Sequence, residues 1–521
     1  MSIPRNALVV AALSCSGLLG GLSLACDAQA ASSRSAKPAA IVADPKTGIF
    51  VAPSGLDTNP GTASAPVRSL SAGAALAIKA AKPNLWVQAG HYGSPSGLPW
   101  GLNVTGGFDA SWNDTGLPSS VINDATTDGA ALVIDANKFT DPFGPSMTLS
   151  HLAVVAKRQS GLSSLTGISL VGPAGSATAT LSDVTVTASG AAAGNDGAPF
   201  DQPASHGIDG GPGHEGMHLG DDWCADPHLS HGKGGAGARG VDPTTGGGHG
   251  GNGGCWDQFS ATWGMRGMPL SLSGSGGGPG YDGKPGTRGL DGTRGRDGSL
   301  GSTGANASGA FALSPDKRVW STDGANDGDF GQSGTFGGPG GGGGGGGADS
   351  GGCDGGLGAG GGGGASGGAG GAGGRPGEGG GGAIGIIAVT TNLQLINRSS
   401  IIAGDGGAGG RGALGQPGGT GGNGGTGGHT DESDGTDGTC GAWIAGGGNG
   451  GNGGTGGTGG SGGGGAGGAS IAVVMSNGHL TKDSSLTLDA GSGGLGGLNG
   501  NDGTSRAATG PSALTATLST P

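Results

Sequence analysis

A unit made of short β-prone runs followed by a glycine-rich run recurs in this chain, and it constrains the fold more than any other feature. The unit is clearest over residues 383–428, where apolar runs separated by polar turns lead into glycine at every third position of 406–427. Further copies of the apolar part occupy 167–188 and 469–490, and glycine follows each of them. Such self-similarity predicts an architecture of stacked repeats.

Each β-prone run is too short to bury a core alone, but stacked copies can do so. Short strands rich in Val, Ile, Leu and Thr suit a parallel β-helix, whose coils pile inward side chains along an axis at a spacing of about 4.8 Å. A helix is disfavoured, because a run such as Ala383–Val389 contains glycine, is β-branched and lacks a polar face of 3.6-residue period. We therefore predict an all-β fold, a right-handed parallel β-helix.

The segment Ile49–Phe108 indicates how such a solenoid begins. Two strand-like parts flank an Ala-rich run, 66–81, in which Leu70, Ala74 and Ile78 share one side of a predicted helix. The segment resembles the amino-terminal cap and first coil of secreted right-handed parallel β-helix proteins of bacteria, a superfamily that includes pectate lyases and polygalacturonases. The resemblance implies that the helix plugs the open end of the solenoid, as terminal repeats generally must.

Composition divides the remaining chain into alternating β-helix and glycine-rich parts. Because each glycine-rich insertion follows the last strand of its unit, we expect all of them to leave the same corner of the solenoid. The predicted parts are a signal peptide at 1–30 (to 25 for a lipoprotein signal), a linker at 31–47, the amino-terminal β-helix at 48–190, an insertion with collagen-like triplets at 191–381, a coil at 382–404, a second insertion at 405–468, a coil at 469–490, and a glycine-rich tail at 491–521.

The glycine-rich runs follow two patterns. Between Gly274 and Gly304 glycine occupies one position in three, which is the collagen pattern, although proline is scarce there. Between Gly447 and Gly468 two residues in three are glycine, and a threefold extended helix with this sequence has two bare ridges along which neighbouring backbones can approach. Collagen-like trimerisation, packed polyglycine-II sheets and mobile loops are all open interpretations. The runs resemble in texture the PGRS repeats of bacterial surface proteins.

Composition and the amino terminus indicate an exported protein. Glycine supplies 137 of 521 residues, which excludes an ordinary globular enzyme over the whole length, and a formal charge of −13 excludes nucleic acid as a partner. Arg5, the apolar stretch Ala7–Leu13 and the Ala28–Ala30 cleavage site indicate a secretory signal. Leu22–Cys26 resembles a lipobox, in which Cys26 would carry the lipid. We expect the mature protein to be extracellular or attached to the cell envelope through that lipid alone.

Four cysteines follow the export segment, and an even number in an exported chain predicts disulfides with three possible connectivities. Most of them lie close to a tryptophan, so each bridge with its aromatic ring would staple a region where glycine offers no side chains to pack. The candidates are Cys224, Cys255, Cys353 and Cys440.

The sequence from His214 to His218 matches the H-E-x-x-H pattern of zinc peptidases, in which a helix presents both histidines to one zinc ion and Glu215 acts as the base. Glycines before, within and after the motif disfavour that helix. We therefore predict a polar loop without metal or cofactor, and name His214 and His218 as the residues that would bind a metal if the motif were real.

Carboxylates near the predicted strands are the other place to look for chemistry, since pectate lyases hold calcium with Asp and Glu beside a basic residue. This sequence offers Asp135 and Asp183, with Lys157 and Arg158 at the end of another strand, and none repeats at coil spacing. We therefore expect no catalytic site and a non-enzymatic surface protein, structural or adhesive, with cell-envelope polysaccharide or other surface components as partners. The alternatives are a polysaccharide lyase or hydrolase and, more remotely, a zinc peptidase. The oligomeric state stays open.

Overall fold

The computed structural model of the chain describes residues 40–517 except for 96, 124–128, 138–142, 158–163, 174, 176, 221–232, 234–235, 237–245, 254, 258–259, 262–287, 309–311, 314–319, 322–331, 333, 337–347, 350–354, 430–442, 445 and 502. Apart from Ala40, these residues belong to one compact unit, Ile41–Pro521. Among them, no helix is long and apolar enough to cross a membrane.

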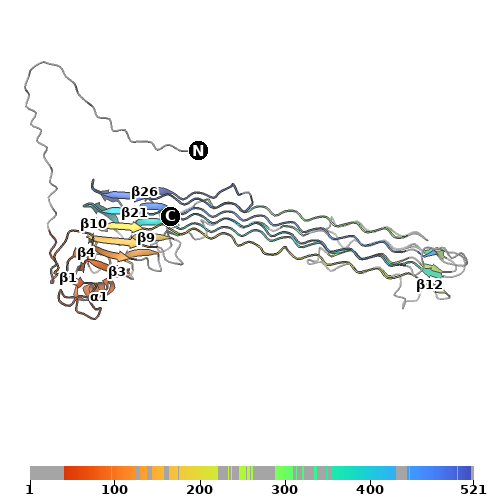
Figure 1. Ribbon diagram of the computed structural model, residues 1–521, viewed down its shortest axis with the longest axis horizontal. Helices are drawn as coiled ribbons and strands as arrows, with labels where there is room; N and C mark the ends of the chain where they lie inside the picture. The colour runs from red at the N-terminus through yellow and green to blue at the C-terminus, as the bar shows by residue number, and fades with distance from the viewer. Residues whose placement is uncertain are drawn as a thin grey trace, which may run out of the picture. The chain divides into compact units, whose positions relative to one another are not determined.

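Three parallel sheets, through which the chain passes in turn, dominate the fold (Figure 1). The first sheet contains β1 (Gly48–Val51), β2 (Asn84–Gln88), β4 (Asn103–Phe108), β7 (Ser146–Ser150), β10 (Thr178–Ser182), β20 (Asn392–Ile396) and β24 (Leu480–Lys482). The second contains β3 (Gly90–Gly93), β5 (Ser120–Asn123), β8 (Leu152–Ala156), β11 (Thr185–Ala188), β21 (Ser400–Ala403) and β25 (Thr487–Ala490). The third contains β6 (Ala130–Asp135), β9 (Leu165–Val171), β19 (Ala383–Val389), β23 (Ser470–Ser476) and β26 (Ser512–Thr517). One strand from each sheet makes one coil, so the predicted parallel β-helix is confirmed.

The three copies found in the sequence are neighbouring turns of this solenoid. In the third sheet Leu165, Ala383 and Ser470 lie side by side, although they are far apart in the chain. The long insertions between them therefore do not disturb the stacking. Each copy supplies the strands that a coil needs, and its neighbours supply the hydrogen-bonding partners.

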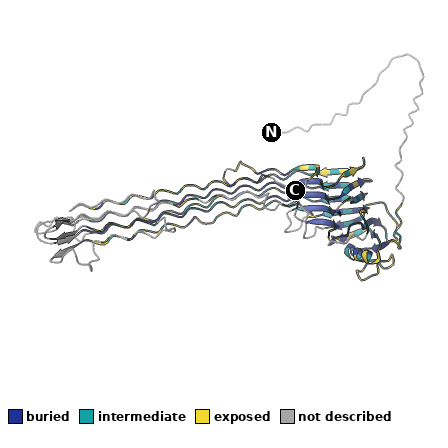
Figure 2. Cartoon of the chain, turned by 180° about the vertical axis from the view of Figure 1, so that it is seen from behind, coloured by how far each residue is buried: buried dark blue, intermediate teal, exposed yellow. Residues whose placement is uncertain are grey.

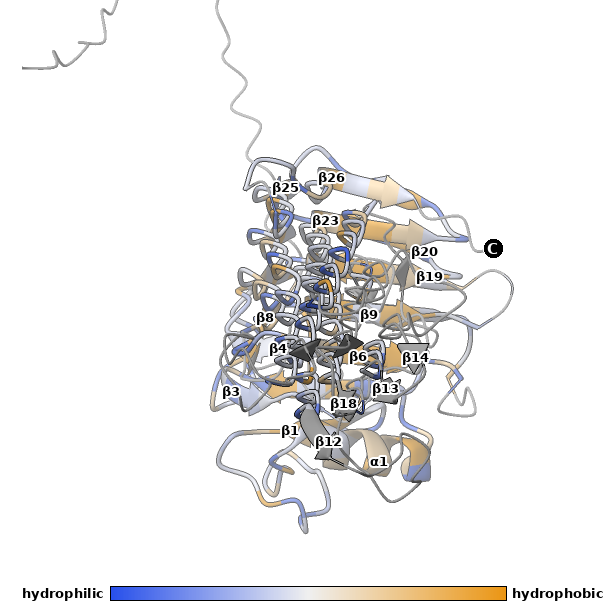
Figure 3. Ribbon diagram, turned by 90° about the vertical axis from the view of Figure 1, so that its right-hand side faces the viewer, coloured by the Kyte–Doolittle hydropathy of each residue, from blue (hydrophilic) through white to orange (hydrophobic). Residues whose placement is uncertain are grey.

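Inward side chains form apolar columns along the axis of the solenoid, and Figure 3 shows the apolar colour gathered on its strands. In the first sheet Leu149, Leu181 and Leu395 lie at matching positions and are fully buried. In the last coil the same position is taken by Lys482, which is exposed. A charge at an inward position of an edge strand disfavours the addition of a further strand.

The single described helix, α1 (Leu70–Ala80), covers the amino-terminal end of the core, as the sequence predicts. Its buried positions are Leu70, Gly73, Ala74 and Ala77, which pack with residues of β1 and β2. The prediction that Ile78 joins this face is wrong, because Ile78 is 39% exposed. Small residues serve this face because the helix backbone lies close to the sheet: a Cβ on Gly73 would contact Val51 at 2.8 Å.

We expect Ser69→Ala to lower the free energy of unfolding by about 1 kcal/mol, which is typical for loss of an amino-terminal helix cap. The Ser69 hydroxyl accepts from the N–H of Ala72 at 3.1 Å, and it donates to Asp57 at 2.9 Å. Urea denaturation measures the change. Ser71→Ala, at the second residue of the helix, leaves the capping side chain of Ser69 in place, so it is the matched control and should change the free energy by less than about 0.5 kcal/mol.

The glycine-rich segments form a bundle of extended chains that lie side by side (Figures 1 and 2). They leave after β11, β21 and β25, all in the second sheet, and return at β19, β23 and β26, all in the third. The prediction of a shared corner is therefore confirmed. The described segments are 189–216, 246–253, 288–308, 332 with 334–336, 358–382, 404–429, 446–469 and, apart from residue 502, the hairpin 491–511.

Backbone hydrogen bonds at every third residue hold these segments together, which is the pattern of polyglycine II. Segment 446–469 donates from Gly453 to Gly422 at 3.0 Å and accepts at Gly454 from Gly368 at 2.9 Å. Its other neighbours are 288–308, 332–336 and the two arms of the hairpin. A threefold chain with no internal hydrogen bonds can bond to six neighbours in this way.

The number of glycines per triplet follows the position of a segment in the bundle. Segment 446–469 is enclosed, and its two glycine ridges meet two neighbours: a Cβ on Gly453 would overlap the carbonyl of Ser366, and one on Gly454 that of Arg296. Segment 288–308 lies outside, with one glycine ridge turned inward and the two residues after each glycine largely exposed. Its collagen-like triplets therefore pair within the same chain. Collagen-like trimerisation is excluded for this stretch, because its glycine ridge is already occupied.

The remaining short strands pair antiparallel among the glycine-rich segments. They are β12 (Met217–Gly220), β13 (Cys255–Asp257), β14 (Ser260–Ala261), β15 (Ala312–Leu313), β16 (Trp320–Ser321), β17 (Ala348–Asp349), β18 (Gly355–Leu357) and β22 (Trp443–Ile444).

Candidate functional site

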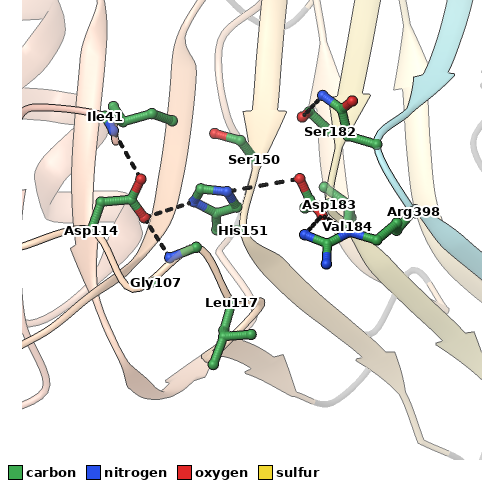
Figure 4. A network of polar contacts seen from close by, with 12 residues as sticks. Ile41, Gly107, Asp114, Leu117, Ser150, His151, Ser182, Asp183, Val184 and Arg398 are labelled. Carbon is green, nitrogen blue, oxygen red and sulfur yellow. Dashed lines mark hydrogen bonds and ion pairs between the residues drawn. The ribbon is translucent and has the colours of Figure 1, made fainter. Parts of the chain in front are cut away.

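Polar side chains collect where the coils turn from the first sheet into the second (Figure 4). His151 separates β7 from β8, Asp183 lies between β10 and β11, and Arg398 lies between β20 and β21. Their φ angles are 52°, 52° and 61°, in the left-handed region that a tight corner requires. Asp and His enter this region more readily than bulky or β-branched residues do. The corner therefore selects polar residues, and stacking of the coils brings them together.

Four side chains form this corner cluster, in which carboxylates alternate with basic groups: Asp114, His151, Asp183 and Arg398. Nδ1 of His151 lies 3.1 Å from Oδ1 of Asp114, and its Nε2 lies 3.9 Å from Oδ2 of Asp183. Oδ1 of Asp183 in turn accepts from Arg398, with 2.9 Å to Nη2 and 3.2 Å to Nε. Asp114 is itself held by the N–H groups of Ile41 and Gly116. The contact between Nδ1 and Asp114 is close but is not aligned as a hydrogen bond.

Burial decides what this corner cluster can do. The side chains of His151, Asp114 and Asp183 are 8%, 4% and 6% exposed, whereas that of Arg398 is 67% exposed. An imidazole between two carboxylates has the parts of an acid–base pair. A substrate would have to reach it, and only the Arg398 guanidinium meets solvent. The arrangement therefore suits a stabilising network that joins three coils to the loop before β5.

Sequence reasoning named Asp183 but missed His151, Asp114 and Arg398. A signal existed in the repeat itself: Leu149-Ser-His-Leu152 and Leu181-Ser-Asp-Val184 have the same pattern, with the polar corner residue in third place. The corner is hard to see in the sequence, because 147–155 is one uninterrupted run of β-prone residues apart from Ser150 and His151. The structure divides that run at His151 into two strands of different sheets.

The other predicted carboxylate and basic residues do not converge. Asp135 ends β6 in the third sheet and accepts from the N–H of Asn137 at 2.8 Å, away from the corner that holds Asp183. Lys157 is exposed after β8, and Arg158 lies outside the described residues. The described part of the chain contains no group of three His, Cys, Asp or Glu side chains placed to bind a metal.

The zinc-peptidase motif does not form the helix that it needs. His214 and Glu215 are exposed on an extended segment whose backbone pairs with Lys233 and Gly360. His218 belongs to β12, which pairs with β18. The predicted failure of the helix is therefore confirmed. At a rise of about 3.3 Å per residue, an extended backbone separates residues i and i+4 by about 13 Å, which is too far for both histidines to bind one zinc ion.

Of the four cysteines, Cys255 begins β13, and the other three lie outside the described residues, as does Cys26. The disulfide and lipidation hypotheses therefore stay predictions.

A second set of carboxylates lies on the outside of the bundle. Alternating Arg and Asp at 288, 291, 294 and 297 share one ridge, since a threefold helix repeats every three residues, and they form two ion pairs. Asp291 also accepts from the N–H of Asn449, and Asp297 from that of Thr455. The two carboxylates thus accept hydrogen bonds from backbone N–H groups of segment 446–469, at positions where those N–H groups point toward the surface of the bundle.

We expect acid to loosen this ridge at Asp297. The Arg294 side chain and the N–H of Thr455 hold the pKa of the Asp297 carboxyl below its ordinary value of 3.8. Because the folded pKa is the lower one, the stabilisation is complete above the ordinary value and is lost as the pH falls through the folded value. The group is exposed, so the effect is local. Hydrogen exchange at Thr455, corrected for its intrinsic rate, should accelerate below about pH 3.8. An Asp297→Asn variant with the same acid response would contradict this.

No family model, curated protein or solved structure matches this chain.

Proposed function

We propose that this protein is a non-enzymatic component exported to the cell surface, where it has a structural or adhesive role. The observation that carries the proposal is the make-up of the bundle. Its inner segments, 358–382 and 446–469, consist mainly of glycine, and most of their glycine, Ala and Ser residues are buried against neighbouring backbone. Its outer ridges carry short polar and charged side chains. A large share of the chain is thus devoted to an exposed surface held together from within, and this suits presentation rather than catalysis.

The amino-terminal resemblance to secreted β-helix proteins, and the texture shared with PGRS repeats, support an extracellular setting. Neither supports an enzyme here, since Asp135 and Lys157 lie away from Asp183, and the corner cluster that contains Asp183 is buried. A glycan-binding screen of the purified mature protein against neutral and acidic polysaccharides tests the adhesive role. Saturable binding to intact cell envelopes without chain cleavage is the expected result. Turnover of any polysaccharide would replace the proposal with the lyase or hydrolase alternative.

Export predicts one of two mature amino termini. Cleavage before Cys26 with lipid attached, or cleavage after Ala30, each gives a distinct mass for the amino-terminal peptide. Mass spectrometry of the cell-envelope fraction and the medium separates the two. A chain that still begins at Met1 and remains in the cytoplasm would contradict export and the surface role together.

Disulfides among Cys224, Cys255, Cys353 and Cys440 would suit the same setting. The strands near three of these cysteines pair with one another, which supports the hypothesis. β18 begins two residues after Cys353 and pairs with β12, which ends four residues before Cys224. β18 also pairs with β13, which begins at Cys255. Peptide mapping without reduction should find two bridges in exported protein. Four free thiols in that material would rule them out.

A further inference from the structure

The hairpin 491–511 fills two of the six positions around segment 446–469, but only near the β-helix. Its outgoing arm donates from Gly500 to Gly462 at 3.1 Å and accepts at Leu498 from Gly412 at 2.9 Å. Its return arm accepts at Ala508 from Gly467 at 2.9 Å. The chain itself thus shows which kind of polypeptide fits these two positions.

Beyond the tip of the hairpin, no described backbone segment continues either position. Side chains reach only their margins: Asp297 accepts from the N–H of Thr455, and Asn452 and Asn449 accept from Gly424 and Gly427 farther along the bundle. Gly415, Gly418 and Gly421 continue the row that donates to the hairpin, and in the described part of the bundle their N–H groups bond to nothing. In segment 446–469 the residue that is not glycine in each triplet becomes more exposed with distance from the hairpin. Ser461 is 5% exposed, Thr458 and Thr455 are half-buried, and Asn452 and Asn449 are exposed. We call this surface, made of Gly415, Gly418, Gly421, Thr455 and Thr458, the open flank.

The hairpin also defines the chemistry of an occupant. Gly494 and Gly497 lie so close to segment 404–429 that a Cβ on either would overlap the carbonyl of Gly407 or Gly410. The row of an occupant that faces this segment must therefore be glycine. The carbonyls of Gly456 and Gly459 continue the row that accepts from the hairpin, so a chain in the same conformation would find both donors and acceptors at every third residue.

We propose that the open flank binds an extended polypeptide of another protein that has glycine at every third residue, in the polyglycine-II conformation. This inference goes beyond the proposed surface role, because it names the chemistry of a partner. Because the test uses purified protein, peptide binding can fail while export and surface location are confirmed. Peptide binding can likewise be confirmed while export fails.

The first test is binding of a labelled peptide of six Gly-Ser-Gly triplets to the mature protein, with hydrogen exchange at 415–421 as the structural readout. Binding should be saturable and should slow exchange at these amides at least tenfold. Thr458→Trp should weaken binding at least tenfold, because the ring fills the flank. Ala198→Trp, at an exposed position of segment 189–216, is the matched control and should leave binding unchanged. An Ala-Ser-Ala peptide should not bind. Concentration-dependent self-association that Thr458→Trp abolishes would assign the flank to a second copy and overturn the proposal.

A second variant tests the same geometry without depending on peptide affinity. Two Ser-Gly-Gly triplets inserted after Gly500 and two Gly-Ala-Thr triplets inserted before Ala507 lengthen both arms in register. If the flank accepts such chains, exchange at Gly415, Gly418 and Gly421 slows at least tenfold and Tm rises. The same insertion with every glycine replaced by alanine should do neither. Unchanged exchange in the glycine variant would overturn the proposal, whatever the free peptide does.

Discussion

Gly453→Ala is expected to lower the free energy of unfolding by about 3 kcal/mol, at the upper end of the usual cost of overpacking an interior. The new methyl group would overlap the carbonyl of Ser366 in segment 358–382. Neither segment can move aside without losing hydrogen bonds, because Gly453 donates to Gly422 and the adjacent Gly454 accepts from Gly368 of segment 358–382. Urea denaturation measures the loss, and hydrogen exchange along 446–469 locates it in the bundle.

The same substitution at Gly190 is the matched control. There a Cβ would lie 3.6 Å from the nearest backbone atom, the carbonyl oxygen of Asp405, which is ordinary van der Waals contact. Gly190→Ala should change the free energy by less than about 0.5 kcal/mol, or raise it slightly by restricting the unfolded chain. Equal losses at Gly190 and Gly453 would show that glycine acts through the unfolded chain and not through close packing in the bundle.

The number of glycines in each triplet predicts whether a segment lies inside or outside the bundle. The contrast between one glycine per triplet in 274–304 and two per triplet in 447–468 follows from how many sides of a threefold chain must be bare. That contrast is readable from sequence, and it separates the outer segment 288–308 from the enclosed 446–469. The exits at one corner were also predictable, because each run begins after the last strand of its unit.

The pairing of the segments could not be predicted from the triplets. A shift of any glycine run by three residues produces an equivalent set of contacts, so the run contains no information on register. The register comes from the flanking strands: Gly380 donates to Ala466 in the bundle just as Ala383 donates to Ala469 in the third sheet. The β-helix thus aligns the segments that it releases.

Most residues of the corner cluster could not be predicted from the sequence. The repeated pattern that contains His151 and Asp183 is a sequence signal for the corner, but nothing near Asp114 or Arg398 in the sequence points to it. Asp114 comes from an irregular loop before β5, and Arg398 arrives across an insertion of nearly two hundred residues. Side chains that meet through stacking of distant coils leave no local pattern.

Asp183→Asn is expected to lower the free energy of unfolding by about 2 kcal/mol, in the range for a buried hydrogen bond to a charged group. Asparagine keeps the size and tolerates the left-handed corner, so this variant isolates the charge. The loss stays below that of a fully buried ion pair, because the Arg398 side chain is 67% exposed and water can replace its partner. Asp183→Ala should cost about 1 kcal/mol more, since alanine at φ 52° adds backbone strain.

Asp201→Asn is the matched control, because Asp201 is exposed on segment 189–216 and its change should stay below about 0.5 kcal/mol. A double variant with Arg398→Ala separates the two contacts of Asp183. If the pair with Arg398 dominates, Asp183→Asn should cost much less in the Arg398→Ala background than in the native protein. If the contact with His151 dominates, the cost should stay near about 2 kcal/mol in both backgrounds. A loss as small as that of Asp201→Asn would mean that coil stacking alone holds this corner and that the polar contacts of Asp183 do not stabilise it.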